Sequence, residues 1–147
     1  MEEPILDREE FAKELSRAQA GELEGMASAA NCYAHGFGVN KNLAKSAYWC
    51  FEALDNPEFQ SEHQRALKLY RRCIFFTLAI LFDGSGFPYK KNRKIACWSY
   101  NQAAICGCKT SRERINAIDW DAEGVVSPEI AKLLIKFRKK NAKELGI

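Results

Sequence analysis

One motif occurs twice in the chain, and this internal repeat constrains the possible folds more than any other feature. Each copy has two glycines separated by one residue, then a lysine-containing segment, then a tryptophan. The copies read Tyr33-x-x-Gly36-x-Gly38-Val39 before Trp49, and Leu81-x-x-Gly84-x-Gly86-Phe87 before Trp98. The glycine pairs are 48 residues apart and the tryptophans 49. A period of this length indicates a stack of similar supersecondary units.

Each unit is predicted to consist of a helix, a glycine turn and a second helix. Apolar residues with helical spacing cover residues 22–35 and 42–54, and the same spacing returns in 57–83 and 92–106. The glycines between them accept the left-handed backbone conformation that ends many helices. Asn42 is a favoured residue for the N-cap of the helix that follows. We expect each tryptophan to fill the space between the two helices of its unit.

Further helices are predicted on both sides of the repeats, and sustained strand alternation is scarce. Asp7 is a good N-cap for a first helix, Ser127-Pro128 is a strong start for a last helix, and residues 110–119 favour another helix. The last helix carries an apolar stripe of Ile130, Leu133, Leu134, Phe137 and Leu145. The sequence therefore predicts one all-α domain over 1–147, with repeat units at 20–56 and 57–107, a capping helix at 7–19 and C-terminal helices over 109–145.

The repeat resembles the units of the SEL-one-like repeat family, relatives of the tetratricopeptide repeats. Those units carry G-x-G-V, an acidic or amide cap, and K-A-x-x-W. The first copy matches at Gly36, Gly38, Val39, Asn42, Lys45 and Trp49, and departs where Ser46 replaces alanine. The second copy is looser, with Phe87, Lys91 and Ile95 at the positions of valine, cap and alanine, and with Asn92 as an alternative cap. The resemblance implies a right-handed α/α superhelix (a solenoid), a groove lined largely by the first helix of each unit, and a role as an adaptor or scaffold.

The six cysteines are expected to be reduced thiols of a cytoplasmic protein. They stand at positions 32, 50, 73, 97, 106 and 108. The N-terminal sequence MEEP is acidic, whereas a secretion signal needs a basic start and an apolar stretch. No apolar run reaches the roughly 18 residues that span a bilayer. Secreted relatives of the resembled family carry disulfides at positions that match Met26, Leu54, Ile74 and Ala103, none of which is cysteine.

The residue patterns predict neither catalysis nor a metal or cofactor site. Cys106 and Cys108 are too close for the usual zinc pair, and His35 and His63 have no Cys or His three to five residues away. The glycine pairs follow helices and lack the lysine and Ser or Thr of a phosphate loop. A cysteine and a histidine could meet in space, but buried or surface thiols are the simpler interpretation. We therefore expect no enzymatic activity.

Charge is distributed unevenly along the chain. Residues 1–62 carry 12 acids and 5 bases, whereas residues 63–147 carry 7 acids and 17 bases. This difference favours an acidic partner for the second half, or head-to-tail self-association. Nucleic acid is less favoured, because the sequence has no aromatic–basic stacking motif. The expected partner-binding platform consists of Arg65, Lys68, Arg71, Arg72, Lys90, Lys91, Arg93 and Lys94.

The resemblance therefore implies a protein–protein interaction module, and the sequence shows no membrane segment. One alternative is an immunity or antitoxin-type protein that binds and neutralises a bacterial toxin, because the charge difference suits an ionic toxin surface. A second alternative is a thiol-based redox or cofactor-binding factor, which only the six cysteines favour. A thiol with a lowered pKa would support the redox alternative.

Overall fold

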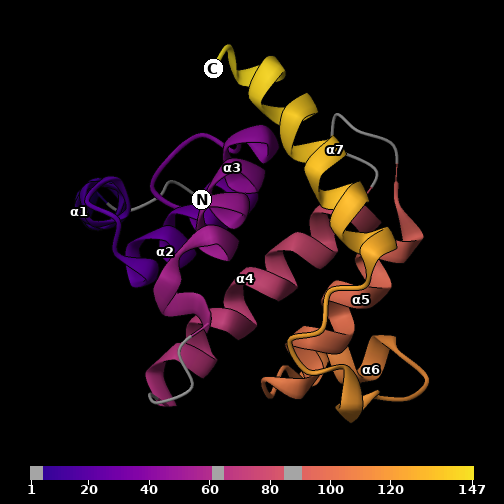
Figure 1. The fold of residues 1–147 in the computed structure, drawn as a ribbon. Coiled ribbons are helices and arrows are strands. Elements are labelled where there is room, and N and C mark those ends of the chain that lie inside the picture. Colours follow the sequence, from indigo (N-terminus) through magenta and orange to yellow (C-terminus); the bar gives the residue numbers. More distant parts are fainter. Residues whose placement is uncertain (1–4, 61–64, 85–90) are drawn as a thin grey trace.

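The computed structural model describes residues 5–60, 65–84 and 91–147, and these residues form helices and connections without a strand (Figure 1). The α-helices are α1 (Ile5–Gln19), α2 (Leu23–His35), α3 (Leu43–Asp55), α4 (Arg65–Asp83), α5 (Arg93–Ile105), α6 (Lys109–Arg114) and α7 (Pro128–Leu145). Two short 3-10 helices, Pro57–Gln60 and Trp120–Ala122, lie in the connections. Among the described helices none is both long and apolar enough to cross a membrane. The all-α prediction is confirmed.

The first predicted unit is a helix pair joined by a capped turn. Gly36 ends α2 in the left-handed conformation, with φ of 75°, and its N–H donates to the carbonyl of Cys32 at 2.7 Å. The Asn42 side chain caps α3 by accepting from the N–H of Lys45 at 3.0 Å. The Asn42 N–H closes the turn by donating to the carbonyl of Tyr33 at 2.9 Å. The predicted roles of Gly36 and Asn42 are therefore confirmed.

The second unit repeats these contacts with one residue more in the turn. The Asn92 side chain caps α5 by accepting from the N–H of Ile95 at 3.0 Å. Its own N–H donates to the carbonyl of Phe82 near the end of α4 at 3.0 Å. Asn92 is thus the cap that a one-residue shift of register predicts. Gly84 directly follows α4, whereas Gly86 lies outside the described residues.

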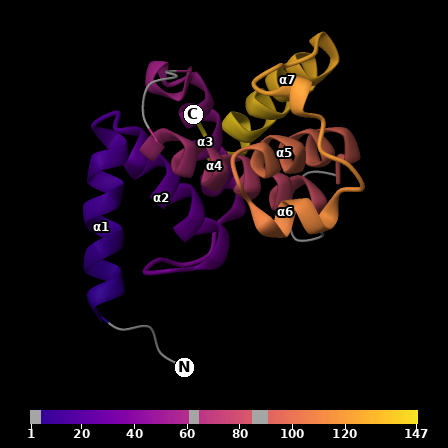
Figure 2. The same ribbon diagram turned by 90° about the horizontal axis from the view of Figure 1, so that it is seen from below.

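Successive helices pack side by side from α1 to α6 (Figure 2). α1 lies on α2, α2 contacts α3 and α4, α4 lies on α5, and α6 packs against α5. The approach of α1 to α2 is close, since a Cβ on Gly25 would lie 2.4 Å from the backbone nitrogen of Ala18. α7 departs from this order, because it crosses back over the stack and contacts both α3 and α5 (Figure 1).

Aromatic side chains join the elements of the core. Phe82 of α4 is fully buried, and its ring meets that of Phe137 in α7 with centroids 5.0 Å apart. Trp49 is buried, with 8% of its surface exposed, as predicted for the tryptophan of the first unit. Trp98 contacts Phe75 of α4 edge to face, with centroids 5.4 Å apart. Its ring is only partly buried, so it packs on the paired helix as predicted but also borders an open space.

Three predicted helix boundaries were wrong. α1 begins at Ile5, two residues before the predicted cap Asp7, which therefore lies inside the helix. The helix predicted over 57–83 is divided into a short 3-10 helix and α4. The helix predicted over 110–119 ends at Arg114, because the backbone becomes extended at the next residue. Helix ends carry weaker local signals than helix interiors, so errors concentrate there.

Replacing Trp49 by alanine should lower the free energy of unfolding by about 3–5 kcal/mol, because it removes a buried indole and leaves a cavity. Trp120→Ala is the matched control, since that ring is 57% exposed. Its free energy of unfolding should change by no more than about 0.5 kcal/mol. Urea denaturation followed by circular dichroism measures both changes, and equal destabilisation would contradict a core role for Trp49.

Candidate functional site

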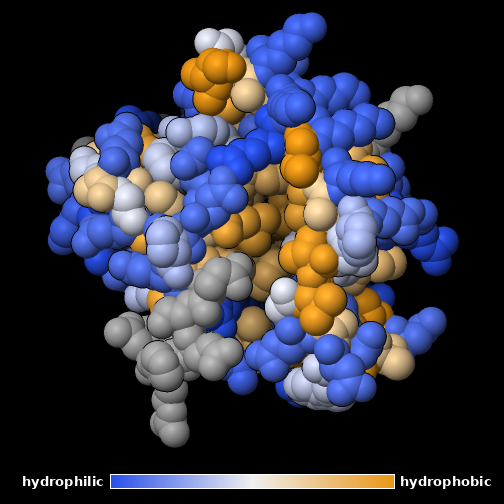
Figure 3. Space-filling model, in the orientation of Figure 1, coloured by the Kyte–Doolittle hydropathy of each residue, from blue (hydrophilic) through white to orange (hydrophobic). Residues whose placement is uncertain are grey.

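A pocket of about 660 Å³ opens where α3, α4, α5 and α7 converge. Figure 3 shows apolar atoms inside this hollow and along one of its edges. α7 and the segment that leads into it form one wall. The lining residues are Phe51, Leu54, Asp55, Phe59, Arg71, Phe75, Trp98, Gln102, Cys106, Glu123, Gly124, Val126, Ala131, Leu134, Ile135 and Arg138. The volume is within the range of ligand-binding pockets, roughly 300–1,000 Å³.

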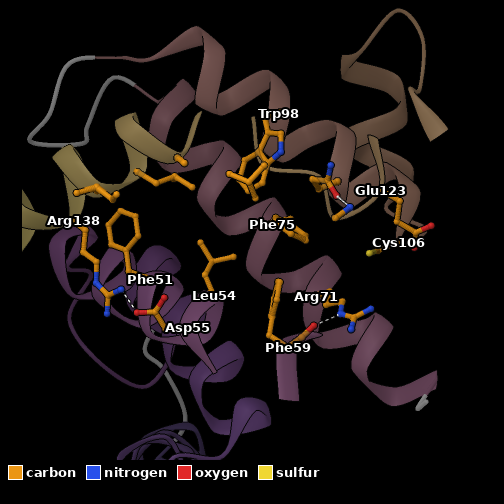
Figure 4. A pocket seen from close by; sticks show the side chains of 16 residues that line it. Phe51, Leu54, Asp55, Phe59, Arg71, Phe75, Trp98, Cys106, Glu123 and Arg138 are labelled. Atoms are coloured by element: carbon orange, nitrogen blue, oxygen red, sulfur yellow. Dashed lines mark hydrogen bonds and ion pairs between the residues drawn. The ribbon is translucent and has the colours of Figure 1, made fainter. Parts of the chain in front are cut away.

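Aromatic rings form much of the pocket surface. Phe75 lies between two edge-to-face neighbours, with its centroid 5.4 Å from that of Trp98 and 5.3 Å from that of Phe59. Phe51 and Leu54 of α3 add to the apolar lining (Figure 4). Packed rings of this kind have few rotamers and offer large apolar contact areas. The pocket is therefore shaped to receive an apolar group.

Side chains of α5 hold the segment that precedes α7. Gln102 is buried, donates from Nε2 to the carbonyl of Ala122 at 2.6 Å, and accepts from the N–H of Gly124 at 2.9 Å. The indole N–H of Trp98 donates to the carbonyl of Val125 at 3.0 Å. Buried polar groups need such partners, and here the partners are backbone groups of the connecting segment. This wall of the pocket is thus positioned by α5.

At one end of the pocket an arginine is paired with carboxylates. The guanidinium of Arg138 in α7 pairs with Asp55 and Glu52 of α3, the latter at 3.2 Å (Figure 4). Burial acts to lower the pKa of Arg138, but the two carboxylates outweigh this effect and the pKa is raised. These ion pairs connect α7 to α3, and two carboxylates against one guanidinium leave this end slightly negative.

The opposite end of the pocket is basic. The Nε of Arg71 donates to the carbonyl of Phe59 at 2.6 Å, and its guanidinium lies 5.8 Å from the centroid of the Phe59 ring. Cys106 and Glu123 lie on the same side of the pocket (Figure 4). Burial raises the pKa of the Cys106 thiol, whereas the cations of Arg71 and Lys68 act to lower it. The nearby cations thus offset only part of the effect of burial on this thiol.

The predicted basic platform is two separate groups. Its described members are Lys68, Arg71 and Arg72 near the start of α4, and Lys91, Arg93 and Lys94 at the start of α5. The two helices form an antiparallel pair, so the groups lie at opposite ends, about 22 Å apart at a rise of 1.5 Å per residue. The helix–turn–helix prediction already implied this separation. Lys90 and the side chain of Arg65 lie outside the described residues.

The two basic groups also have different neighbours. Lys91 pairs with Asp83 at 3.6 Å, and Lys94 pairs with Glu129 at the start of α7. Among the described platform residues, Arg71 alone lines the pocket. The group on α4 is therefore the one associated with the pocket.

The contribution of α7 to the pocket was missed by the sequence analysis. Leu134 belongs to the predicted apolar stripe, but Ile135 and Arg138 do not, and all three line the pocket. The groove implied by the family resemblance runs along the first helices, α2 and α4. The pocket instead lies among the second helices, α3 and α5, with α4 and α7. The stripe on α7 indicated that this helix packs against something, without indicating where.

Burial disfavours the reactive thiolate form at three of the six cysteines. None of the six forms a disulfide in the structure. Burial raises the pKa of Cys50, Cys73 and Cys106, whereas a reactive thiol has a lowered pKa. Within the three described stretches, no group of three His, Cys, Asp or Glu side chains is arranged to hold a metal ion.

A scan against protein-family models finds no match to this chain, and searches of curated proteins and of solved structures find none either. The internal repeat and the geometry of the pocket are therefore the features that indicate a function.

Arg71→Gln should raise the pKa of Cys106 further, because it removes a cation that favours the thiolate. Since the thiolate is the reactive form, alkylation of Cys106 by iodoacetamide at about pH 8 should become slower. Arg93→Gln is the matched control, because Arg93 lies at the far end of the α4–α5 pair. Peptide mass spectrometry gives the rate for this cysteine. Equal rates in both variants and the wild type would contradict the electrostatic contact between Arg71 and the thiol.

Proposed function

We propose that this chain is a protein-binding module of the SEL-one-like repeat type, with units at 20–56 and 57–107 that belong to an α/α superhelix. The matching construction of the two units supports this proposal. In each unit an asparagine caps the second helix and its N–H returns to a carbonyl near the end of the first. α6 then packs against α5, and α7 crosses back over α3 and α5, as atypical elements that flank repeat units can do.

The observation that carries the proposal is the apolar pocket with its exposed apolar edge. Val126 and Ile135 line the pocket, yet they are 45% and 57% exposed, and Val125 is 55% exposed. Adjacent apolar side chains in water mark interaction sites when they form a patch. Binding hot spots of proteins are concentrated in well-packed pockets of this kind. A partner that inserts an apolar side chain among α3, α4, α5 and α7 would cover both the pocket and its edge.

The cysteines favour binding in a reducing compartment over redox chemistry. Burial raises the pKa of Cys106, the thiol that lines the pocket, so thiolate is scarce at neutral pH. No disulfide joins the six cysteines, which fits a cytoplasmic location, where thiols stay reduced. The pocket is thus better explained by recognition of an apolar group than by attack of a thiolate.

Ile135→Glu should weaken binding of the natural partner roughly tenfold or more, because it places a charge at an apolar interface. Phe37→Glu is the matched control, since Phe37 is 52% exposed in the turn between α2 and α3 and does not line the pocket. The partner is obtained by crosslinking in the native host, and its affinity for each purified variant is measured by calorimetry. Unchanged affinity of the Ile135→Glu variant would overturn the proposed function.

A further inference from the structure

The two ends of the pocket differ in charge. At the Arg138 end, two carboxylates of α3 exceed the single guanidinium. At the other end, Arg71 lies in the wall, and Lys68 and Arg72 stand near it on the same part of α4. Glu123 is the acid that lines this end among the described residues. Three cations and one carboxylate leave this end positively charged.

Contacts of Arg71 and Arg72 with neighbouring elements place these two cations at or near the pocket. The carbonyl of Phe59 accepts from Arg71 at 2.6 Å. Arg72 reaches the end of α5, since a Cβ on Gly107 would lie 3.7 Å from its Nη1. Burial and the carboxylate of Glu123 raise the pKa of Cys106, whereas all three cations act in the opposite direction, so their field extends to the pocket wall. An anion bound at this end would therefore be stabilised.

The edge of the pocket indicates that the ligand is a polypeptide. Val125, Val126 and Ile135 extend the apolar surface beyond the cavity and are about half exposed. A free small molecule that filled the cavity would leave this edge in water. A polypeptide that enters across the edge would cover the cavity and the edge together, as interface segments around an anchoring side chain do.

We infer that the pocket takes a short segment of a partner protein in which a large apolar side chain is adjacent to an acidic residue. This inference rests on the protein-binding function proposed above. The apolar side chain lies against Phe59, Phe75 and Trp98, and the carboxylate lies at the end formed by Lys68, Arg71 and Arg72. Because carboxylates exceed the guanidinium at the opposite end, the charge difference along the pocket gives the segment one orientation.

The basic group at the start of α5 is a poorer site for the same carboxylate. Lys91 already pairs with Asp83, and Lys94 already pairs with Glu129. An acidic segment at that end would have to compete with these carboxylates, and no described pocket residue there would receive the apolar side chain.

Two short peptides that differ only in one carboxylate test the inference. The probes are acetyl-Leu-Phe-Asp-amide and acetyl-Leu-Phe-Asn-amide, titrated into the isotope-labelled full chain. The indole N–H of Trp98 reports binding by NMR, because Trp98 lines the pocket, and Trp98→Phe assigns its signal. The Asp peptide should bind roughly threefold to tenfold more tightly than the Asn peptide at low salt. This preference should diminish as the salt concentration rises.

Two double variants, each lacking two cations, show which of the two basic groups binds the carboxylate. Lys68→Gln with Arg72→Gln should weaken the preference for the Asp peptide, because Arg71 alone remains at this end, and should leave the affinity for the Asn peptide unchanged. Lys91→Gln with Lys94→Gln is the matched control and should keep the full preference. Far-UV circular dichroism verifies that both proteins remain helical. If the control variant alone lost the preference for the Asp peptide, the carboxylate would bind at the start of α5, and the inference would be overturned.

Other outcomes would also overturn it, each in a recognisable way. Equal affinity of the wild type for the two peptides would show that the recognised segment needs no acidic residue. The proposed protein-binding function would remain intact. No response of Trp98 to either peptide would reject the apolar segment, and the Ile135→Glu measurement would then decide the proposed function separately. Tighter binding of decanoate than of the Asp peptide would identify a free amphipathic carboxylate as the ligand instead.

Discussion

The contact between Phe82 and Phe137 is the interaction on which the pocket depends. The two rings are 55 positions apart in sequence, and their packing brings α7 back over the helix pairs. The ion pairs between α7 and α3 are largely exposed, and such pairs contribute little alone. Burial of Phe137, together with Ile130 and Asn141 of the same helix, therefore contributes more to the position of α7 than the ion pairs do. Leu134 and Ile135 form a pocket wall because they belong to this helix.

The polar groups around the pocket fall into two sets with different tasks. Gln102 and Trp98 hold the segment before α7, and Arg138 connects α7 to α3. The partners of these groups are part of the fold itself, so they shape the pocket without selecting a ligand. The cations on α4 are different, because their charge exceeds that of the nearby acid Glu123. Charge selection is thus confined to one end of an otherwise apolar site.

Much of the helical structure could be predicted because its signals are local. Asn42 and Ser127 cap their helices through hydrogen bonds to residues three positions on, and such bonds depend on a few neighbouring residues. Asn92 does the same, although the motif alone left Lys91 and Asn92 as alternatives. The start of α1 was mistaken because Asp7 is as acceptable inside the first turn of a helix as at its cap.

The sequence by itself was sufficient for the all-helical class, for the two helix pairs and for most of their limits, since caps, turn glycines and the 3.6-residue period act over short distances. It was not sufficient for the pocket. An apolar stripe shows that a helix will be buried, but many surfaces can bury it at similar free energy. The packing of α7 on α3 and α5 was set by the shapes of side chains far apart in sequence. That packing placed Arg71, Trp98 and Ile135 around one cavity.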